Sequence, residues 1–370
     1  MRVRELDVSR AADWNDLVAA EGSFALTQAR EWGAFKARLG WRVRRIGVED
    51  GDGRLVAGAQ LLIKPLPLGL TLAYVPRGPV GRWHEPEVAT LLLARLERCA
   101  QAEGAVFLKL EPAVAVGAPV LDLLARHGFR ESRVTNQPRT TMLLDVSGAP
   151  EDVLGRMRKK TRQYVRRAER EGITTRLGAT DDLPAFHDLM RKTARREGFA
   201  PRSLAYHQAE WDVFSAGGLC ALLLAHHEGR LIAVRTVHRF GRHAAEFHGG
   251  SVTTPGLHPN HLLVWRAVEW AREHGCSTYD LWGIPDEVEP AADGGRPEAP
   301  ERRDGLWGVY RFKRGFGADV VRYAGAYDLV LKPRAYSVLT AAMIDRSLWE
   351  RAAARLDRVA SSTIFKGAAP

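Results

Sequence analysis

The sequence contains few cysteines and none of the short motifs that mark metal, phosphate or nucleophile sites. Its 370 residues include three cysteines, Cys99, Cys220 and Cys276, and none forms a CxxC pair. Isolated thiols are typical of buried side chains in a reducing compartment, so we expect neither a disulfide nor a cysteine zinc site. HxxxH, HExxH, GxSxG and Walker motifs are also missing. The sequence therefore predicts no metal and no organic cofactor.

Long apolar runs are missing too. The N-terminus, MRVRELDVSR, lacks the apolar core of a signal peptide. The longest apolar stretch, residues 61–75, is interrupted by Lys64, Pro65, Pro67 and Gly69 and cannot cross a bilayer as a helix. We therefore expect a cytoplasmic protein, monomeric, for which peripheral contact with a membrane surface is compatible with the sequence.

Acidic residues are outnumbered. The chain has 54 Lys and Arg against 44 Asp and Glu, a formal net charge of +10. Such a surface attracts polyanions, namely nucleic acid, anionic lipid or phosphorylated metabolites. The alternative is a proteome that is generally rich in arginine, which would give the same excess of positive charge without a polyanionic partner.

An internal repeat dominates the organisation of the chain. Residues 53–110 begin with GRLVAGAQLLIK and end with LLLARLERCAQAEGAVFLKL, whereas residues 229–281 begin with GRLIAVRTVHRF and end with LLVWRAVEWAREHGCSTYDL. Each copy predicts a β-branched strand, an amphipathic helix, a glycine stop and another strand. The expected fold class is α+β, with two GNAT-like (N-acyltransferase) domains from an internal duplication and mixed sheets flanked by helices.

The densest charge run lies in residues 156–170, on a helix predicted to start near Pro150 and to end at Gly172. It has eight basic residues and one acid, Glu169. Since no acid lies four residues away to neutralise them, we expect these cations to be available to RNA phosphates or a diphosphate. A solvated helix face is the alternative. The candidate RNA-binding residues are Arg158, Lys159, Lys160 and Arg166.

Other candidates lie at strand ends and in a late aromatic segment. Residues 310–317, YRFKRGFG, alternate aromatic and basic residues, which predicts a strand with Lys313 opposite Phe312; an exposed edge strand protected by lysine is the alternative. YVPRGP (74–79) and KLEP (109–112) end strands of the first copy, and DLWG (280–283) ends a strand of the second. Glu111 is a candidate proton acceptor for an attacking amine, or a surface carboxylate paired with Lys109 or Arg77. Residues 285–305 are expected to be a mobile, mostly acidic insertion, and residues 336–359 an amphipathic helix.

Seven motifs, in order along the chain, resemble those of the Fem family of peptidoglycan aminoacyltransferases (FemA/FemX type, FemAB family). They are QAREWGAFK (28–36), YVPRGP (74–79), KLEP (109–112), RKKTR (158–162), PNHLL (259–263), YDLWGI (279–284) and YRFKRGFG (310–317). Because residues 150–218 are too few for a coiled-coil arm, the chain is similar to the armless, FemX-like form. The resemblance implies two GNAT-like domains, the first completed by the C-terminal segment. We therefore expect residues 1–147 and 320–370 to form the first domain and residues 148–319 the second.

The resemblance also implies an activity and roles for residues. Family members transfer an amino acid from aminoacyl-tRNA to the stem-peptide amine of a peptidoglycan precursor, here UDP-MurNAc-peptide or a lipid-linked one. By motif, Lys36 and Arg162 would hold the precursor phosphates, Lys313 would contact the aminoacyl-RNA, and Glu111 replaces the family's aspartate. Further substrate contacts are expected from Trp32, Tyr74, Arg77, Asp280 and Trp282. The tyrosines that often precede a Gly-Ala-Ser turn in the family are replaced by Glu246, Phe247 and His248.

Three alternatives stay open. A CoA-dependent N-acyltransferase fits the fold, yet the pyrophosphate-binding signature R/Q-x-x-G-x-G/A is absent from SVTTPGLHPN (251–260) and from RGPVGRWHEP (77–86). A non-catalytic RNA-binding protein would need only the basic helix. Transfer from tRNA to a protein N-terminus also uses a duplicated acyltransferase fold.

Overall fold

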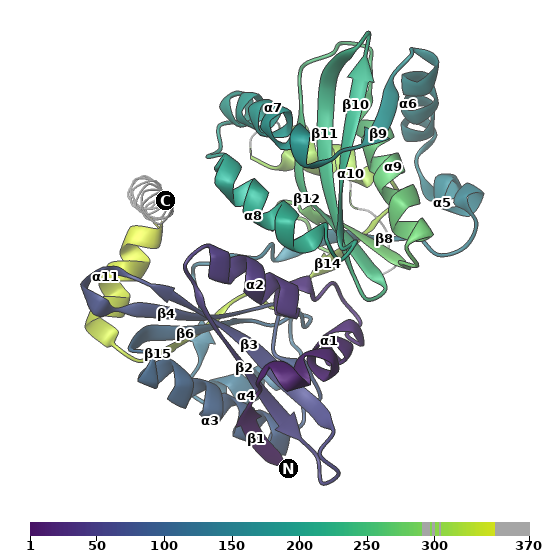
Figure 1. Cartoon of the computed structure of the whole chain (residues 1–370). Helices are drawn as coiled ribbons and strands as arrows, with labels where there is room; N and C mark the ends of the chain where they lie inside the picture. Colours follow the sequence, from purple (N-terminus) through teal and green to yellow (C-terminus); the bar gives the residue numbers. More distant parts are fainter. Residues whose placement is uncertain (291–296, 298–299, 303–304, 345–370) are drawn as a thin grey trace, which may run out of the picture. The chain divides into compact units, whose positions relative to one another are not determined.

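The computed structural model describes residues 1–290, 297, 300–302 and 305–344. The chain divides into two compact units (Figure 1): Met1–Gln137 with the chain from Tyr323 onward, and Pro138–Arg322. Each unit has a mixed β-sheet with helices packed on it, so the α+β class is confirmed. Among the described helices, none combines the length and the apolar character needed to cross a membrane.

The sheet of the first unit is mixed. Its strands lie in the order β1 (Arg2–Glu5), β2 (Arg42–Glu49), β3 (Leu55–Pro65), β4 (Thr71–Pro76), β6 (Ala105–Glu111), β15 (Tyr327–Val330) and β7 (Arg130–Glu131), with β5 (Val80–Gly81) paired to β3. β4 and β6 run parallel. The helices are η1 (Val8–Arg10), α1 (Ala11–Ala19), η2 (Leu26–Gln28), α2 (Arg30–Arg38), η3 (Pro67–Gly69), α3 (Pro86–Ala102), α4 (Val120–Arg126) and α11 (Pro333–Ile344).

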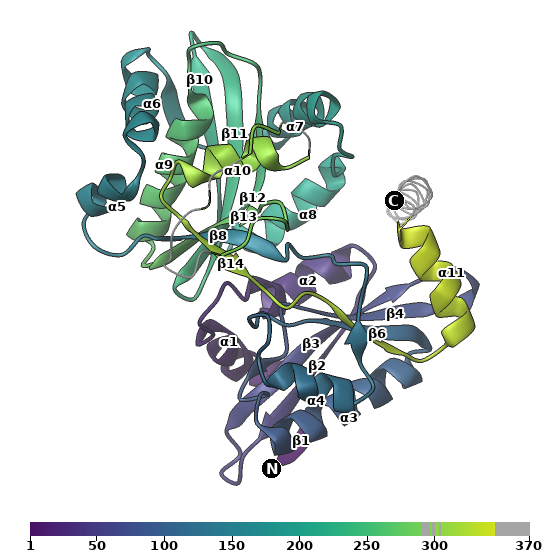
Figure 2. The ribbon, with the colours of Figure 1, turned by 180° about the vertical axis from the view of Figure 1, so that it is seen from behind.

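Helices cover both faces of this sheet (Figures 1 and 2). α3 starts with Pro86 in its first turn and buries Val88, Leu92 and Leu96 at helical spacing against one face. On the other face α1 packs directly on the backbone of β3. A Cβ added to Gly58 would lie 2.6 Å from the ring of Trp14, so only glycine allows this approach.

The second unit has a sheet of the same kind. Its strands lie in the order β14 (Asp319–Arg322), β8 (Thr140–Asp145), β13 (Thr278–Gly283), β12 (His243–Ser251), β11 (Arg230–Phe240), β10 (Cys220–His227) and β9 (Thr174–Leu177), with β12 and β13 parallel. The helices are α5 (Pro150–Arg156), α6 (Lys159–Arg170), η4 (Thr180–Asp182), α7 (Leu183–Glu197), α8 (Leu204–Phe214), α9 (Pro259–Glu273) and α10 (Trp307–Arg314). α6 and α9 lie on one face, and α7 and α8 on the other (Figure 1).

The two units repeat one order of elements, as the sequence repeat predicts. The series β2, β3, β4, α3, β6 corresponds to β10, β11, β12, α9, β13. In each unit the parallel pair joins the strand before the long helix to the strand after it. The neighbouring strand comes from another part of the chain, from β15 in the first unit and from β8 in the second.

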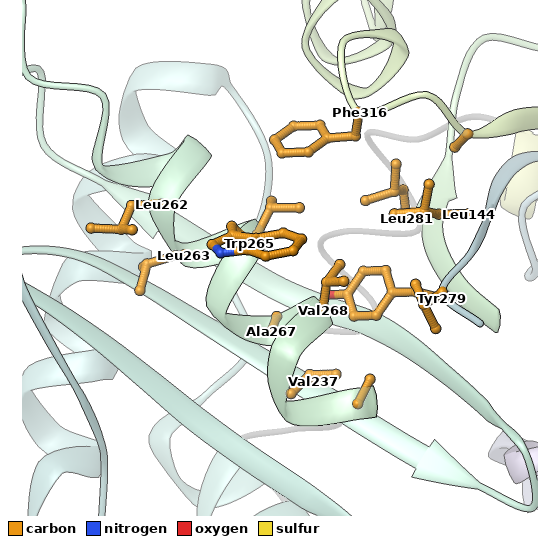
Figure 3. Packing of buried hydrophobic residues seen from close by; sticks show 14 of the residues in the cluster. Leu144, Val237, Leu262, Leu263, Trp265, Ala267, Val268, Tyr279, Leu281 and Phe316 are labelled. Carbon is orange, nitrogen blue, oxygen red and sulfur yellow. The ribbon is translucent and has the colours of Figure 1, made fainter. Parts of the chain in front are cut away.

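The core of the second unit lies between α9 and the sheet (Figure 3). Tyr279 from β13 and Phe316 point toward Trp265 and Val268 of α9, and all four side chains are buried. Fully burying a large apolar side chain of this kind stabilises the fold by about 1.5–3 kcal/mol. This core also fixes the segment that follows α10.

The expected domain boundaries need correction. β8 was assigned to the first domain, but it pairs with β13 and β14 of the second sheet. Met142 and Leu144 on β8 belong to the second core. Pairing between strands that are distant along the chain determines which unit β8 belongs to. The boundaries therefore lie after Gln137 and after Arg322, rather than after residues 147 and 319.

Three local predictions also differ from the structure. Residues 307–314 form a helix rather than a strand, because Trp307, Tyr310, Lys313 and Arg314 recur at helical spacing on its buried side. The single helix expected from Pro150 breaks into α5 and α6, since the backbone is extended between them. The tail helix starts at Pro333, earlier than expected, and its predicted part beyond residue 344 lies outside the described residues. Residues 291–296, 298–299 and 303–304 of the insertion expected at residues 285–305 also lie outside the described residues. Val288, which belongs to the same expected insertion, is buried in the core.

Candidate active site

A buried carboxylate lies at the end of the central strand of the first unit. Glu111 ends β6, and Tyr74 comes from β4, the parallel neighbour. The Tyr74 hydroxyl donates to Glu111 Oε2, and the Asn136 amide donates to Oε1 at 2.5 Å. The Gln137 amide donates to Oε2 at 3.2 Å, and its side-chain Nε2 donates to the Tyr74 oxygen at 3.1 Å. Glu111 is thus held by donors from three other residues.

The environment shifts the acidity of both groups. Burial raises the pKa of Glu111, while the hydrogen bonds from Tyr74 and Asn136 oppose the shift. Burial, together with the charge of Glu111, raises the pKa of Tyr74 well above its usual value. Lys109 forms its ion pair with Asp328 at 2.8 Å, so the alternative of Glu111 as a surface carboxylate paired with that lysine is wrong. A carboxylate with a raised pKa suits a proton acceptor.

The first two motifs of the Fem resemblance form one structural unit. Gln28 Nε2 donates to the Pro76 carbonyl at 2.6 Å, and Gln28 Oε1 accepts from the Gln60 amide at 2.7 Å. A Cβ on Gly78 would lie 2.7 Å from the Gln28 side chain. Between Pro76 and Gly78 the chain turns, and Arg77 adopts the left-handed region with φ 49°. This conformation costs about 1–2 kcal/mol for a non-glycine residue. The buried Arg77 guanidinium lies 4.2 Å from the ring centroid of Tyr323.

Lys36 lies over aromatic rings on α2. Its Nζ is 4.7 Å from the ring centroids of both Trp32 and Phe35, which are themselves in edge-to-face contact at 5.5 Å. A cation over such rings gains roughly 0.5–1 kcal/mol at a partly exposed position. The rings therefore orient a half-buried ammonium group in the last turn of α2.

A second buried cluster surrounds Lys313 on α10. Its Nζ donates to the Gly283 carbonyl at 2.9 Å and lies 3.8 Å from Glu246 Oε1. Glu246 on β12 is also paired with Arg235 of β11. Burial lowers the pKa of Lys313, while the charges of Glu246 and Asp280 oppose the shift. The amine is therefore easier to deprotonate than that of an exposed lysine. Its position is set by Gly283 at the end of β13 and by Glu246 on the neighbouring strand β12.

Asp280 and Trp282 shape the end of β13. Asp280 accepts hydrogen bonds from the Thr141 hydroxyl and, at 2.7 Å, from the Trp282 amide. Trp282 has φ 66°, and its ring packs 4.9 Å from that of Phe247. The sequence predicts a role for this strand end, but not Glu246 as the partner of Lys313, nor Arg235 as the partner of Glu246. The opposite charges of Arg235 and Glu246 on adjacent strands are the signal that would have indicated this pair.

The basic helix is only partly as expected. Arg158, Lys159, Lys160 and Arg166 are exposed. Arg162 Nη1 donates to the Gly155 carbonyl at 3.2 Å and to the Met157 carbonyl, so it caps the end of α5. The expectation that no acid neutralises this run is wrong, because Arg167 pairs with Glu171 at 3.3 Å and Arg156 pairs with Asp145 at 3.7 Å.

The basic helix is joined to the segment that follows Lys313. The Arg158 amide donates to the Gly315 carbonyl at 2.9 Å. A Cβ on Gly315 would lie 2.3 Å from the Thr161 hydroxyl, and one on Gly317 would lie 2.3 Å from the Arg156 carbonyl. Both glycines are thus needed for this contact, which brings the exposed end of α6 next to the chain two residues beyond Lys313.

Two family models match the chain. Residues 11–120 match the FemAB family, and residues 155–294 match a domain described as an acetyltransferase (GNAT) domain. Proteins named lipid II:glycine glycyltransferase from Staphylococcus aureus strains MRSA252 and NCTC 8325 are each 25% identical over 391 residues. These alignments cover 85% of this chain and 90% of each relative.

Solved structures show the same fold. A crystal structure of FemX matches with a TM-score of 0.81 at 23% identity, over 92% of this chain and 100% of that one. A tandem GNAT protein from the clavulanic acid biosynthesis pathway matches with a TM-score of 0.54 at 13% identity, over 88% of this chain and 97% of that one. The prediction of two GNAT-like domains is thereby confirmed, and the FemAB family model, the relatives and the FemX structure support the predicted resemblance to the Fem family.

Proposed function

We propose that this protein transfers an amino acid from aminoacyl-tRNA to an amine on the stem peptide of a peptidoglycan precursor. Similarity to the Fem family supports transfer in peptidoglycan bridge synthesis, and the Staphylococcus aureus relatives are named for glycyl transfer on lipid II. The precursor, UDP-MurNAc-peptide or lipid-linked, supplies the acceptor amine and a phosphate group for recognition. The aminoacyl ester supplies an activated carbonyl, so the protein mainly contributes position and electrostatics.

The observation that carries this proposal is the buried Lys313 next to the attachment of the basic helix. In the reaction, the deprotonated acceptor amine attacks the ester carbonyl and a tetrahedral oxyanion forms. The C–N bond forms, the C–O bond to the terminal ribose breaks, and the ribose oxygen takes up a proton. Lys313, held by Gly283 and close to Glu246, would stabilise the oxyanion as a preorganised donor. The exposed cations of α6, Arg158, Lys159, Lys160 and Arg166, would contact the RNA phosphates.

The first unit would bind the precursor. Lys36 would contact the phosphates as a charge-assisted partner, with Trp32 orienting its ammonium group. Glu111, supported by Tyr74 and with its pKa raised by burial, would accept the proton that the acceptor amine loses. Arg77 would support the strand end beside Glu111 in the first unit, whereas Asp280 and Trp282 would support the strand end beside Lys313 in the second. Arg162, which caps the end of α5, would contact the precursor phosphates, as the resemblance implies.

A CoA-dependent acyl transfer is the second candidate. The match of residues 155–294 to a GNAT acetyltransferase domain favours it. The chain lacks the pyrophosphate signature at residues 251–260, which lead into α9. In that segment the ring of His258 stacks on that of Tyr164, with centroids 3.7 Å apart, so an aromatic contact occupies the place of the glycine-rich signature.

A donor comparison tests the proposal. The purified chain is incubated with UDP-MurNAc-pentapeptide or lipid II, and with mixed charged tRNA, uncharged tRNA or acetyl-CoA, and the precursor is weighed by mass spectrometry. We expect the mass of an aminoacyl residue to be added with charged tRNA alone. An acetyl group added from acetyl-CoA, without aminoacyl transfer, would establish the second candidate. RNA binding with no product from any donor would contradict both.

A further inference from the structure

A cluster of buried ionisable side chains lies in the second unit, on the face of the sheet covered by α7 and α8. His207 and Glu210 are three residues apart on α8, and His248 comes from β12. Glu210 Oε2 lies 3.0 Å from His248 Nε2 and 3.7 Å from His207 Nδ1. One ligand atom from each of these three residues lies within 4.8 Å of the others. None of them belongs to the site around Lys313.

The way α8 packs is unusual for a helix on a sheet. Its buried residues are His207, Glu210 and Phe214, so two of the three side chains that it buries are polar. A buried carboxylate costs several kcal/mol unless it is paired or binds a metal. Within the described part of the chain, His207 Nδ1 has no hydrogen-bond partner, although only 3% of the residue is exposed. The helix thus presents a buried donor set that its neighbours satisfy only in part.

We propose that His207, Glu210 and His248 bind a divalent transition-metal ion of the zinc class. Two imidazoles and one carboxylate are a ligand set that zinc accepts, with bonds of about 2.0–2.2 Å and tetrahedral ligand atoms about 3.3 Å apart. The two distances from Glu210 Oε2, 3.0 Å and 3.7 Å, are close to that spacing, and the remaining pair of ligand atoms lies within 4.8 Å. A small cavity, lined in part by Leu183, Phe186 and Trp211, adjoins the cluster and leaves room for a fourth ligand such as water.

A third histidine, His238, lies next to the proposed ligand set. His238 Nε2 on β11 lies 3.9 Å from Glu210 Oε1, and the His238 ring stacks on Phe247 at 4.4 Å. At 3.9 Å this contact is longer than a hydrogen bond, and among the described residues neither ring nitrogen of His238 has a hydrogen-bond partner.

The ion would join α8 to β12. Glu246, the partner of Lys313, lies on the same strand two residues before His248. Metal binding would therefore stabilise the strand that positions the proposed oxyanion donor. The expectation of no metal, which came from the missing HxxxH and HExxH spacings, did not consider ligands from a helix and a distant strand.

The test uses the full chain without an affinity tag. After dialysis against a chelator, the protein is titrated with Zn²⁺ in competition with a chromophoric chelator and, separately, with Co²⁺, whose visible absorption reports the ligand geometry. We expect about one ion per chain, the visible bands of four- or five-coordinate Co²⁺, and a higher Tm with Zn²⁺ than without. Failure of the wild-type chain to bind Zn²⁺ or Co²⁺ in this way would overturn the proposal, whatever the variants do.

Variants assign the ligands. Glu210→Gln and His248→Gln should each weaken Zn²⁺ binding at least about tenfold, with the far-UV circular dichroism confirming that they fold. His187→Gln is the matched control, because its ring on α7 lies near His207, with centroids 5.9 Å apart, yet His187 is outside the proposed set. Equal affinity in all three variants and the wild type would show that the ion binds elsewhere and would also overturn the proposal.

Discussion

Replacing Lys313 with methionine separates a catalytic lysine from a structural one. Methionine has nearly the same length and no charge, so the packing of α10 on the sheet is retained. The substitution removes the hydrogen bond to the Gly283 carbonyl, 2.9 Å long, and the interaction with Glu246 at 3.8 Å. Glu246 keeps its pairing with Arg235, so no buried charge is left alone.

The expected change in stability is small. A buried carbonyl left without its donor costs about 1–3 kcal/mol. Against this, the variant no longer buries an ammonium group, whose desolvation is the main cause of the lowered pKa of Lys313. The two effects oppose each other, so we expect the free energy of unfolding to change by less than about 2 kcal/mol.

The expected change in turnover is large. Removing one preorganised oxyanion donor lowers kcat by about 10²–10³, equivalent to about 2.7–4 kcal/mol of transition-state stabilisation. The assay measures kcat and KM for aminoacyl-tRNA at saturating precursor, alongside urea unfolding. Lys332→Met is a matched control, because Lys332 also donates to a backbone carbonyl, that of Gly104 at 2.8 Å, but is exposed in the first unit. A stable Lys313→Met variant with turnover within about threefold of the wild type would refute the reasoning, since an oxyanion donor is worth far more.

Three further predictions concern other residues. Lys36→Ala should raise KM for the precursor about tenfold with little change in kcat, because a phosphate contact of roughly 1.4 kcal/mol is lost; an unchanged KM would count against this contact. Glu111→Gln should lower kcat by about 10²–10⁴ and abolish the acidic limb of the pH–rate profile. Because burial raises the pKa of Glu111 above its ordinary value, the folded state favours the protonated carboxyl, so the wild type should also lose stability as pH rises through that pKa, and the variant should not; equal pH dependence of unfolding in both would contradict the assignment. Gly315→Ala should destabilise the protein by about 1–3 kcal/mol, because its Cβ meets the Thr161 hydroxyl, whereas Gly308→Ala on α10, with open space around it, should be neutral or slightly stabilising; equal unfolding free energies would show that the close approach is not required.

The sequence predicted the features that repeat locally. The duplicated pattern of strand, helix and glycine stop appears in both units, and α3 and α9 lie where their apolar spacing indicated. Motifs at strand ends were also informative: Tyr74 and Glu111, separated along the chain, come together because β4 and β6 are parallel neighbours. In both examples the pattern of a strand, a helix and the next strand, which is visible in a continuous stretch of sequence, determines which strand ends meet.

Features set by long-range pairing were predicted less well. β8 was assigned to the wrong unit because its partners, β13 and β14, lie more than 130 residues further along the chain. The segment around Lys313 alternates aromatic and basic residues, which fits a strand, yet Trp307, Tyr310 and Arg314 also fit a helix and packing selected the helix. The pairing of Lys313 with Glu246, and the cluster of His207, Glu210 and His248, depend on elements that meet only in the folded chain.

The most direct test of the account follows a labelled amino acid from RNA to the precursor. tRNA charged with isotope-labelled amino acids is mixed with the protein and lipid II or UDP-MurNAc-pentapeptide, and the product is fragmented in a mass spectrometer. The account predicts a labelled residue in amide linkage on the side-chain amine of the third stem-peptide residue, or on a residue already added there, and none after prior hydrolysis of the aminoacyl ester. A precursor that stays unlabelled while the intact aminoacyl-tRNA is present, with the protein folded, would contradict it.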